Sequence, residues 1–349
     1  MTTAAPDRLD AAPLTLPERP LVSIVIPCLN EERYITALLD SLAAQDYGAD
    51  GIEVLVADGG STDRTRELVR GYPSPFARLE LVDNPRRITV AGLNEGMKAA
   101  RGDCWIIIGA HSKVRPDFVR CSVEALRRTG AACVGGPIAT VGEGTVGKAI
   151  AAAMSSPFGV GNAKFRYAED AGWVDTVPFG CYHRRVWEVV GEFDETVDGA
   201  DEDSYNARLI EAGGRIWLDP SIRSTYYPRR TLGALARQYR EYGAAKGTLF
   251  ARGRPLRPRH FAPAAMVLGG PSLWLAGRVV KAARVLLWLL AALYLGLGMV
   301  MAARAAARQG ANPLLTFAAM ATMHVAYGAG FIEGWWRERG RAGATEPAV

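Results

Sequence analysis

The sequence predicts an α/β fold with a mostly parallel central sheet, followed by apolar helices toward its C-terminal end. Two apolar, β-branched runs without polar alternation, LVSIVIP at 21–27 and IEVLVA at 52–57, are typical of strands buried on both faces. Helical segments separate these runs from each other and from a third strand near 79–82, which is the alternation of a parallel sheet. Three uncharged stretches follow later in the chain, at 261–277, 285–303 and 314–332.

The second of these strands ends in the turn DGGSTD, which joins it to the next helix. Two glycines permit a tight turn and a close approach of a ligand to the backbone, and Ser61 or Thr62 can cap a helix that begins near Arg64. Open α/β sheets bind ligands at the carboxyl ends of their strands. Asp58 and Asp63 are therefore expected at the lip of a ligand crevice, although a capped turn with two solvated acids would explain the same residues.

Composition restricts the classes of function. The 349 residues carry a formal net charge of +5, and 49% of them are hydrophobic. The arginines become denser after Arg223, beside the apolar stretches, which favours a membrane surface over nucleic acid as the partner. The five cysteines show no C-x-x-C spacing, so they indicate reduced core thiols in a cytosolic compartment and no zinc site.

Several motifs, in their order and spacing, resemble those of family 2 glycosyltransferases, which are nucleotide-sugar-dependent enzymes with a GT-A fold. They are VSIVIPCLNEE from Val22, VLVADGGSTDRT from Val54, Asn94-x-Gly96 and the ARGD of residues 100–103. The resemblance covers residues 21–242 and is greatest for the subgroup of the succinoglycan-biosynthesis glucosyltransferase. The motifs that indicate this subgroup are NPRRITVAGLNEG from Asn84, AHS from Ala110, VDTVPFGCYHRRVW from Val174 and GEFDE from Gly191.

The resemblance implies that the nucleotide-sugar donor binds at Pro27, Asn30, Glu31, Asp58, Arg87, Asn94 and Ala110. The first four would line the base pocket, where a buried carboxylate that accepts the N3–H of uracil would select the base. Many relatives carry two adjacent acids at this point, whereas this chain has Gly59 after Asp58. Arginine is suited to bidentate binding of phosphate, so Arg87 is expected at the diphosphate, although Arg86 and Arg87 also fit an ordinary solvated pair.

A divalent cation, Mg²⁺ or Mn²⁺, is the cofactor that the resemblance implies. In the family, the strand at 104–108 ends in Asp-x-Asp or Asp-Ala-His, whose side chains hold the cation on the diphosphate, and these hard cations prefer oxygen ligands. This chain has Gly109, Ala110 and His111 there. His111 keeps the register of a ligand, but Gly109 replaces the leading acid. Either His111 suffices with the diphosphate and waters, or another acid takes part, or the cation site is impaired.

An acidic cluster before a helix, Asp201, Glu202 and Asp203, is the expected source of the catalytic base. An inverting transferase needs one carboxylate to deprotonate the acceptor hydroxyl as it attacks the anomeric carbon, and a helix N-terminus favours the ionised form. Counting back from Arg208 aligns the family's base with Glu202, whereas matching Glu-Asp literally gives Asp203. Both remain candidates, and a solvated acidic first turn is the alternative to a catalytic role.

These observations divide the chain into a disordered N-terminal tail at 1–20, a GT-A domain at 21–250 and a membrane-associated region of two or three apolar helices at 251–340. A membrane span needs roughly 20 apolar residues, which the second and third apolar stretches provide, whereas prolines and glycines interrupt the first. The tail lacks the apolar core of a signal peptide. We therefore expect a multi-pass protein of the plasma membrane with its catalytic domain in the cytoplasm.

The sequence thus predicts a membrane-anchored, inverting hexosyltransferase. Its donor would be a nucleotide sugar, with UDP-glucose favoured, and its acceptor a lipid-linked saccharide in polysaccharide biosynthesis. Direct transfer to a polyprenyl phosphate is a variant of the same class. The alternative from another class is a non-catalytic GT-A scaffold in a polysaccharide assembly complex, which Gly109 favours and which Asp58 and the acidic cluster argue against.

Overall fold

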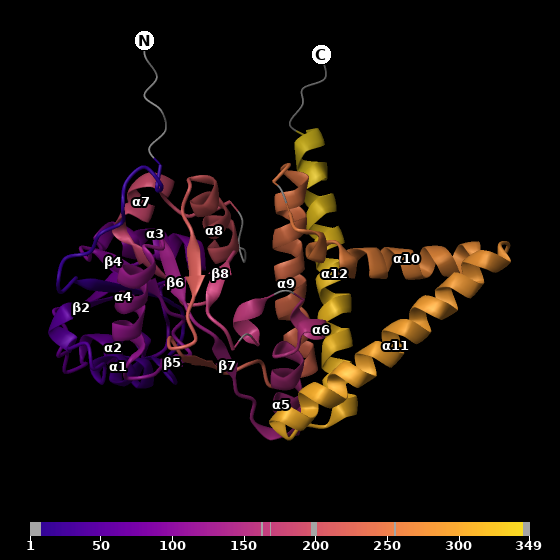
Figure 1. Ribbon diagram of the computed structural model, residues 1–349, viewed down its shortest axis with the longest axis horizontal. Coiled ribbons are helices and arrows are strands. Elements are labelled where there is room, and N and C mark those ends of the chain that lie inside the picture. The colour runs from indigo at the N-terminus through magenta and orange to yellow at the C-terminus, as the bar shows by residue number, and fades with distance from the viewer. Residues whose placement is uncertain (1–7, 162, 168, 197–200, 255, 345–349) are drawn as a thin grey trace, which may run out of the picture. The chain divides into compact units, whose positions relative to one another are not determined.

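The computed structural model describes residues 8–344 apart from 162, 168, 197–200 and 255, and the chain divides into two compact units (Figure 1). The first unit consists of residues 1–139 and 167–226, and the second of residues 140–166 and 227–349. The main sheet lies in the first unit, while the second unit is helical.

In the described part of the chain, the first unit is built around a sheet of eight strands in the order β3-β2-β1-β4-β9-β6-β10-β8. The strands are β1 (Val22–Cys28), β2 (Ile52–Asp58), β3 (Arg78–Asp83), β4 (Cys104–Ile107), β6 (Cys133–Gly135), β8 (Gly172–Val174), β9 (Cys181–His183) and β10 (Ile216–Leu218). β1 to β4 pair in parallel, as do β6 and β10, whereas β8 and β9 pair antiparallel to their neighbours. The predicted α/β fold with a mostly parallel sheet is confirmed.

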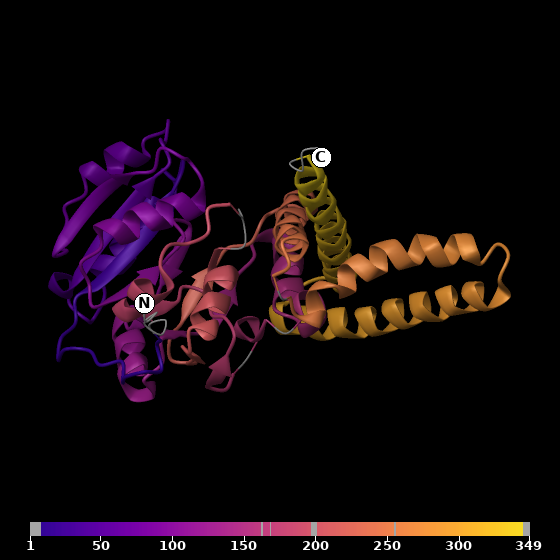
Figure 2. The ribbon, with the colours of Figure 1, turned by 90° about the horizontal axis from the view of Figure 1, so that it is seen from above.

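Helices cover both faces of this sheet, which explains why its central strands lack polar alternation (Figure 2). On one face, side chains such as Ile24, Val54 and Ile106 form a core with the helices α1 (Ile35–Ala43), α2 (Thr65–Arg70) and α4 (Phe118–Thr129). The opposite face carries α3 (Thr89–Ala99), α7 (Arg184–Val190) and α8 (Asp201–Glu211). There, Trp105 of β4 stacks on Tyr182 of β9 with ring centroids 4.2 Å apart, and these rings hold α8 in place.

The register brings the ends of neighbouring strands level with one another. Cys28 pairs with Asp58 across β1 and β2, and Asp58 pairs with Asp83 across β2 and β3. β4 ends on the other side of β1, where Ile107 pairs with Val25. The loops that follow these parallel strands therefore share one edge of the sheet, which is the edge where α/β folds bind ligands.

Shorter elements complete the first unit. They are the 3-10 helix η1 (Ala49–Gly51) and the small sheet of β5 (Ser112–Val114), β11 (Ser224–Tyr226) and β7 (Ile138–Thr140). β5 comes directly after the loop at 109–111, so its pairing with β11 fixes the far end of that loop.

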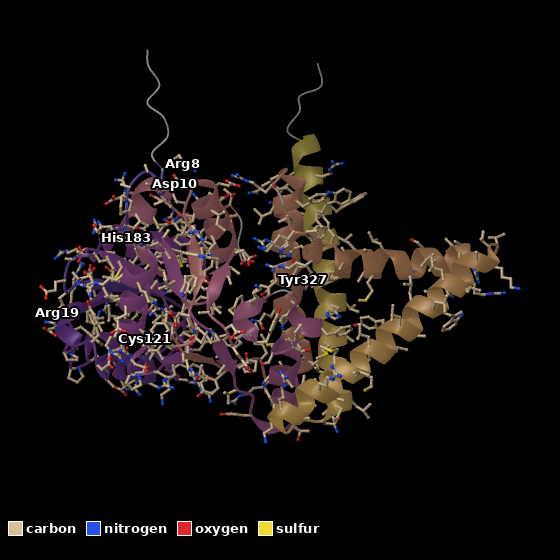
Figure 3. All side chains as sticks on the ribbon, viewed as in Figure 1. Arg8, Asp10, Arg19, Cys121, His183 and Tyr327 are labelled. Atoms are coloured by element: carbon tan, nitrogen blue, oxygen red, sulfur yellow. The ribbon has the colours of Figure 1, made fainter. Side chains whose placement is uncertain are left out.

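The N-terminal segment at 8–20 packs on the first unit, whereas the sequence suggests a disordered tail there (Figure 3). Leu9 is 4% exposed, and its N–H donates to a carbonyl of the turn after α8. Nε2 of His183 donates to the carbonyl of Thr15 at 3.0 Å. A composition rich in proline and alanine favours disorder. The residues that hold this segment in place lie far away in the sequence, so no local pattern predicts that it is ordered. The first part of the tail, 1–7, lies outside the described residues.

The second unit consists of helices in its described residues. They are α5 (Gly144–Met154), α6 (Pro157–Val160), η2 (Lys164–Arg166), α9 (Leu232–Ala251), η3 (Pro258–His260), α10 (Ala262–Ala276), α11 (Lys281–Gln309) and α12 (Pro313–Ala344). Residues 140–166 and 227–250, which the sequence suggests as part of the GT-A domain, belong to this unit because α5 and α9 pack against α12.

Close packing of α9 on α12 depends on glycines spaced four residues apart in both helices. A Cβ atom on Gly243 or Gly247 of α9 would lie 2.0 Å from a backbone oxygen of α12, and one on Gly330 or Gly334 of α12 would lie 2.0 Å from a backbone oxygen of α9. Small residues at this spacing let two helix backbones approach closely. An ion pair of 2.8 Å between Arg240 and Glu333 adds to the contact.

α10 and α11 form a hairpin that projects from α12 within this unit (Figures 1 and 2). Large apolar side chains are exposed along it, among them Leu268, Trp274, Leu275, Val279, Trp288, Leu289, Leu293 and Leu297. Among the described helices, α11 and α12 are long and apolar enough to cross a membrane. The most apolar window of α11 has a mean hydropathy of 2.3 and is 11% buried, compared with 1.3 and 39% for α12. The apolar surface of α11 is therefore mostly exposed, whereas the protein itself covers more of the apolar surface of α12.

Candidate active site

The loops after β1 and β2 are joined to each other at the carboxyl edge of the sheet. Asn30 has a positive φ of 56°. Its N–H donates to Oγ of Ser61 at 2.8 Å, and its Oδ1 accepts from the N–H of Thr62 at 2.8 Å. The N–H of Glu31 donates to Oγ1 of Thr65 at 2.8 Å. Two of the predicted donor-binding residues, Asn30 and Glu31, are thereby held against the DGGSTD turn.

The carboxylate of Asp58, which is 1% exposed, organises that turn. It accepts hydrogen bonds from the N–H groups of Gly60 (3.0 Å) and Ser61 (3.1 Å), from the hydroxyl of Ser61 (2.5 Å) and from Nη1 of Arg66 (2.6 Å). Burial by itself raises the pKa of Asp58, but the hydrogen bonds from Ser61 and Arg66 outweigh it, so the pKa lies below its usual value. Protein donors thus engage the group that the sequence suggests as the acceptor for uracil.

The surroundings of these loops are acidic. Burial raises the pKa of Cys28 to about 12, and the charges of Glu31 and Asp58 add to this effect. The thiol therefore stays neutral and is no nucleophile. A diphosphate at such an edge needs cationic partners, and the arginines of the loop before α3 are the nearest group of that kind suggested by the sequence. Pro27 lies at this end of β1, half-buried and opposite Ala57.

The two arginines of the loop before α3 have different surroundings. Arg86 lies between two glutamates, with Nη1 at 2.5 Å from Glu195 and Nη2 at 2.5 Å from Glu95. Arg87 has a positive φ of 60° and is exposed, and a Cβ on Gly60 would lie 3.6 Å from its Nη1. In the described part of the chain no side chain pairs with its guanidinium. Arg87 is therefore the member of the pair that can receive a phosphate.

Asn94, which the sequence suggests as a donor-binding residue, has its side-chain contacts in the loop between α7 and α8. Its side chain is 0% exposed. Nδ2 donates to the carbonyl of Phe193 (3.1 Å) and to Oε1 of Glu195 (2.7 Å), and Oδ1 accepts from the N–H of Phe193 (2.8 Å). In this structure the amide is thus engaged by three hydrogen bonds within the protein, and its role at the donor stays a prediction.

His111 and Glu31 meet from separate loops. Nδ1 of His111 lies 3.4 Å from Oε1 of Glu31, while Ala110 is 2% exposed and offers only its backbone. Among the described residues, no group of three or more His, Cys, Asp or Glu side chains could hold a metal ion. A Cβ on Gly109 would make ordinary contacts, 3.5 Å to Oγ of Ser112 and 3.9 Å to Cε1 of His111. His111 and Glu31 by themselves are too few ligands for a cation site, although the backbone leaves room for an acid at Gly109.

The first turn of α8 presents Glu202 toward the sheet. Residues three and four positions apart share a helix face, so Glu202 lies on the face of Tyr205 and Asn206, which are both 0% exposed. Burial raises the pKa of Tyr182 in β9, and the charge of Glu202 contributes to the same shift. The helix face that carries Glu202 is the face that contacts the sheet, since Tyr205 and Asn206 both contact Tyr182.

The other two acids of the cluster are placed differently. Asp203 lies three and four positions from Asn206, which is buried, and Ala207, which is exposed, and it is half-buried as Glu202 is. The side chain of Asp201 and residues 197–200 lie outside the described residues. The geometry favours Glu202 as the base, and this assignment stays a prediction.

A buried polar chain fixes α8 to the segment before β9. The hydroxyl of Tyr182 donates to Oδ1 of Asn206 at 2.9 Å, and Nδ2 of Asn206 donates to Oγ1 of Thr176 at 3.1 Å. Buried side chains that satisfy one another in this way specify a single arrangement. The orientation of the face that carries Glu202 is thereby determined.

Two structural partners of the site were not predicted from the sequence. Arg66 bridges Asp58 and Asp83, with Nη2 at 2.9 Å from Oδ1 of Asp83. Glu195 receives hydrogen bonds from Asn94 and Arg86. The sequence carries no signal for either contact, although Glu195 lies in the motif GEFDE and its partners lie in the motif NPRRITVAGLNEG.

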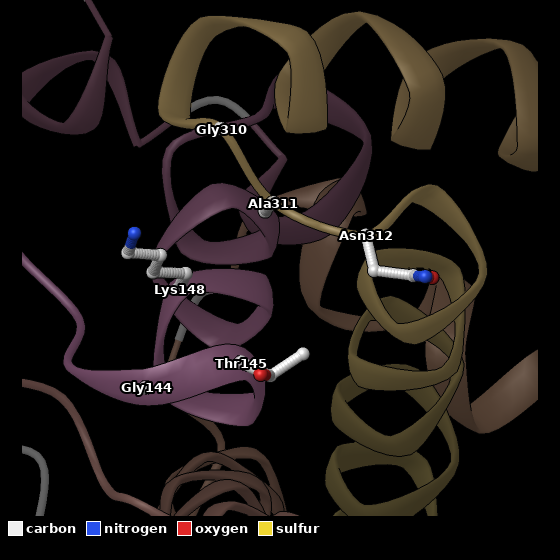
Figure 4. A pocket seen from close by; sticks show the side chains of 6 residues that line it. All are labelled: Gly144, Thr145, Lys148, Gly310, Ala311 and Asn312. Carbon is white, nitrogen blue, oxygen red and sulfur yellow. The ribbon is translucent and has the colours of Figure 1, made fainter.

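A separate pocket of about 270 Å³ lies in the helical unit, between the start of α5 and the turn from α11 to α12 (Figure 4). Its lining consists of Gly144, Thr145, Lys148, Gly310, Ala311 and Asn312. None of the residues predicted to bind the donor belongs to it, and Lys148 is its one charged side chain among the described residues. This pocket is therefore not the donor site.

Sequence comparisons connect the chain to sugar-transferring proteins. The family model for Glycosyl transferase family 2 matches residues 23–187. The chain is 34% identical over 319 residues to the succinoglycan biosynthesis protein ExoA of Rhizobium meliloti, covering 90% of this chain and 94% of that protein. It is also 33% identical over 240 residues to a dolichyl N-acetyl-alpha-D-glucosaminyl phosphate 3-beta-D-2,3-diacetamido-2,3-dideoxy-beta-D-glucuronosyltransferase of Methanococcus voltae, covering 66% and 74%.

Among solved structures, the mannosyltransferase PcManGT from Pyrobaculum calidifontis, in complex with GDP-Man and Mn²⁺, is similar to this chain. The TM-score is 0.63 at 21% sequence identity, and the match covers 95% of this chain and 92% of that one. This similarity shows a shared fold.

Proposed function

Because the chain belongs to glycosyltransferase family 2 and has the GT-A fold, we propose that it is a membrane-anchored, inverting enzyme that moves a hexose from a nucleotide sugar to a lipid-linked saccharide. Membership of the family makes it a sugar-transferring enzyme with relatives in polysaccharide biosynthesis. The alignment with a protein named for succinoglycan biosynthesis runs over nearly the whole chain. UDP-glucose is the first donor to test, because the motifs of the chain resemble those of a glucosyltransferase subgroup.

The donor binds at the carboxyl edge of β1, β2 and β4 in this proposal. Asn30, Glu31 and the turn organised by Asp58 form the wall for the base, with Pro27 beneath it and the backbone of Ala110 opposite. Arg87 binds the diphosphate, because it is exposed and a guanidinium forms charge-assisted hydrogen bonds with phosphate oxygens. A base bound here would meet backbone groups of the turn in addition to side chains.

Glu202 acts as the base. The hydroxyl of the acceptor attacks the anomeric carbon of the donor sugar, its proton passes to the carboxylate of Glu202, and the nucleoside diphosphate leaves with the electrons of the broken bond. The observation that carries this assignment is the position of Glu202 on the buried face of α8, where the first turn of the helix favours an ionised carboxylate.

A divalent cation is not required by these steps. PcManGT was crystallised with Mn²⁺, and the resemblance implies Mg²⁺ or Mn²⁺, but here His111 and Glu31 would have to rely on diphosphate oxygens and waters to complete a coordination shell. We therefore assign the neutralisation of the diphosphate to Arg87, and the cation dependence is left to measurement.

The membrane element is the hairpin of α10 and α11. At 1.5 Å per residue, α11 is roughly 43 Å long, which exceeds the hydrocarbon thickness of about 30 Å. Arg278 lies in the turn of the hairpin, and Lys281 and Arg284 lie in the first turn of α11. The guanidinium of Arg278 lies 4.8 Å from the ring centroid of Trp274. Tryptophans and cations are the residues that anchor proteins at lipid headgroups.

α12 supports the hairpin rather than adding a second span in this proposal. Its C-terminal half is in backbone contact with α9, and the ion pair of Arg240 with Glu333 lies along that contact. In place of the multi-pass arrangement expected from the sequence, we propose one inserted hairpin, with the catalytic unit on the cytoplasmic side where nucleotide sugars are made.

Vesicle flotation tests the membrane element with matched leucines. Leu289→Asp and Leu293→Asp change side chains of α11 that are each 63% exposed, and Leu314→Asp changes one of α12 that is 67% exposed. We expect the two α11 variants to lose flotation with anionic vesicles and the α12 variant to keep it. If the α12 variant also fails to float with the vesicles, α12 contacts lipid, and the result would support the multi-pass arrangement instead.

A transfer assay tests the reaction. Full-length protein in lipid nanodiscs is incubated with radiolabelled UDP-glucose, UDP-galactose or GDP-mannose together with a polyprenyl phosphate or a polyprenyl-diphosphate sugar. We expect label in the organic phase with UDP-glucose and the diphosphate-linked sugar, and none with Glu202→Gln. Product with polyprenyl phosphate alone would identify the other acceptor class. Donor binding without any transfer would indicate the non-catalytic scaffold.

A further inference from the structure

The loop between α7 and α8 is held by a side chain from α3. Both backbone groups of Phe193 bond to the amide of Asn94, which lies in the middle of α3. Phe193 is 3% exposed, and its ring stacks on Tyr205 of α8 with centroids 4.0 Å apart. The loop therefore contacts the helix of the predicted base on one side and the helix that follows the donor loop on the other.

Glu195 in the same loop connects it to the donor loop directly. Its Oε1 accepts from Nδ2 of Asn94 at 2.7 Å, and its Oε2 accepts from Nη1 of Arg86 at 2.5 Å. The second amino group of Arg86 binds Glu95 of α3 at 2.5 Å. Arg86 is the neighbour of Arg87, so the residue that holds Glu195 belongs to the loop assigned to the diphosphate.

Glu195 also precedes the predicted base by seven positions in the chain. Arg208 of α8 closes the arrangement from the other end, because its Nη1 donates to the carbonyl of Val190 (3.0 Å) and its Nη2 to that of Glu192 (2.6 Å). Donor loop, connecting loop and α8 are thus tied together by charge-assisted hydrogen bonds, which are about twice as strong as neutral ones.

We propose that Glu195 is a positioning residue, which sets the distance between the diphosphate held by Arg87 and the carboxylate of Glu202. This inference rests on the proposed function. Its physical basis is that a small displacement of a base from its substrate lowers the rate steeply while binding changes little. When the charge of Glu195 is removed, Glu95 still holds Arg86, so the donor loop keeps its place and the segment before α8 loses its charged partner.

The test compares two glutamates of the same loop. Glu195→Gln keeps the shape of the side chain and removes its charge, and Glu192→Gln does the same at a residue that is 52% exposed and paired with Lys98 at 3.3 Å. We expect Glu195→Gln to lower kcat at least tenfold, with the Kd of UDP within threefold of wild type and an unchanged binding stoichiometry. Glu192→Gln should stay within twofold in both. Equal kcat values for the two variants would overturn the proposal.

A second variant separates positioning from folding. If Glu195 acts through Arg86, then adding Glu195→Gln to an Arg86→Gln background should lower kcat by no more than a further twofold, because residues that act through one contact are not additive. Independent, multiplicative losses would contradict the coupling. Hydrogen exchange of the amides at 201–205 should be faster in Glu195→Gln than in Glu192→Gln. That readout tests the inference even if the wild-type protein transfers no sugar, which would refute the proposed function alone.

Discussion

Nη1 of Arg66 lies 2.6 Å from Oδ2 of Asp58, and the same guanidinium reaches Asp83 with its other nitrogen. This pair joins the ends of β2 and β3 beneath the predicted donor site. Because the side chain of Asp58 is fully buried, the pair is desolvated on the carboxylate side, where electrostatic interactions are stronger than at the surface. The first role of Asp58 is therefore to shape the turn that the donor meets.

Loss of the partner of Asp58 should destabilise the protein. Arg66→Gln leaves a buried carboxylate without its cation, and breaking one side of such a pair costs roughly 3 kcal/mol. Arg64→Gln is the matched control, since Arg64 is 67% exposed and pairs with Glu67 at the surface, where ion pairs contribute about 0–1 kcal/mol. Urea unfolding measures both values. If the free energy of unfolding falls equally in the two variants, burial of Asp58 does not strengthen its ion pair with Arg66.

The lowered pKa of Asp58 also predicts a pH dependence of stability. Folding lowers this pKa, so the folded state holds the proton less tightly than the unfolded chain does. The stabilising contribution is complete above the unfolded pKa of about 3.9 and is lost as the pH falls through the lower folded value. The difference in Tm between wild type and Asp58→Asn should therefore be constant from pH 7 to pH 5 and should shrink below pH 4. A difference that grows toward low pH would contradict the assignment.

The parts of the structure that follow from local pattern were predictable. Unbroken apolar runs predicted β1 and β2, and the alternation of strands with helices predicted that the loops after these strands share the carboxyl edge of the sheet. Contacts between residues that only the fold brings together were not predictable. No local pattern in the sequence indicates that Arg66 contacts Asp58 or that Glu195 contacts Asn94. Asn94 was expected at the donor because its motif has a family likeness, which does not separate a role in folding from one in binding.

The helical unit shows the same limit. The spacing of Gly243 and Gly247, and of Gly330 and Gly334, is visible in the sequence. It indicates a close helix contact, but it does not say which two helices meet. The pairing of α9 with α12 is therefore a structural finding, and with it the inclusion of residues 227–250 in the helical unit.

Substitutions at the two acids of α8 should separate the base from its neighbour. We expect Glu202→Gln to reduce turnover by at least a hundredfold, in the range typical of a general base, without weakening donor binding. Asp203→Asn should stay within a few fold of wild type, because its helix neighbour Ala207 is exposed, whereas both corresponding neighbours of Glu202 are buried. Turnover is measured from released UDP. The reverse pattern would move the role to Asp203, and full activity in both variants would remove the base from this helix turn.

Gly109→Asp should create dependence on a divalent cation. The contacts of a Cβ at this position are ordinary ones, so the backbone accepts the side chain without strain. The new carboxylate would stand beside His111 and supply an oxygen ligand of the kind that Mg²⁺ and Mn²⁺ prefer. We expect Mn²⁺ to tighten UDP binding at least tenfold in this variant, relative to Gly109→Asn as the neutral control. If both variants respond to Mn²⁺ alike, the carboxylate does not reach the diphosphate.

The contact between α9 and α12 predicts opposite effects for two glycines of one helix. Gly→Ala in a helix normally stabilises by about 0.5–1 kcal/mol, and we expect this sign at Gly340, where a Cβ would meet nothing within 4 Å. At Gly334 a Cβ would lie 2.0 Å from the carbonyl oxygen of Ala244, so the two backbones must separate. Gly334→Ala should lower the Tm and Gly340→Ala should not. A rise in Tm for both would mean that α9 and α12 are not in backbone contact.

The most direct test of the central claim is calorimetric titration of UDP-glucose and UDP into the full-length protein in detergent, once with Mn²⁺ and once with EDTA. The proposed function predicts saturable binding of both ligands, lost in Arg87→Gln. It also predicts little difference between Mn²⁺ and EDTA, because the diphosphate is assigned to Arg87. Absence of binding under both conditions would contradict a UDP-sugar donor site at this edge of the sheet.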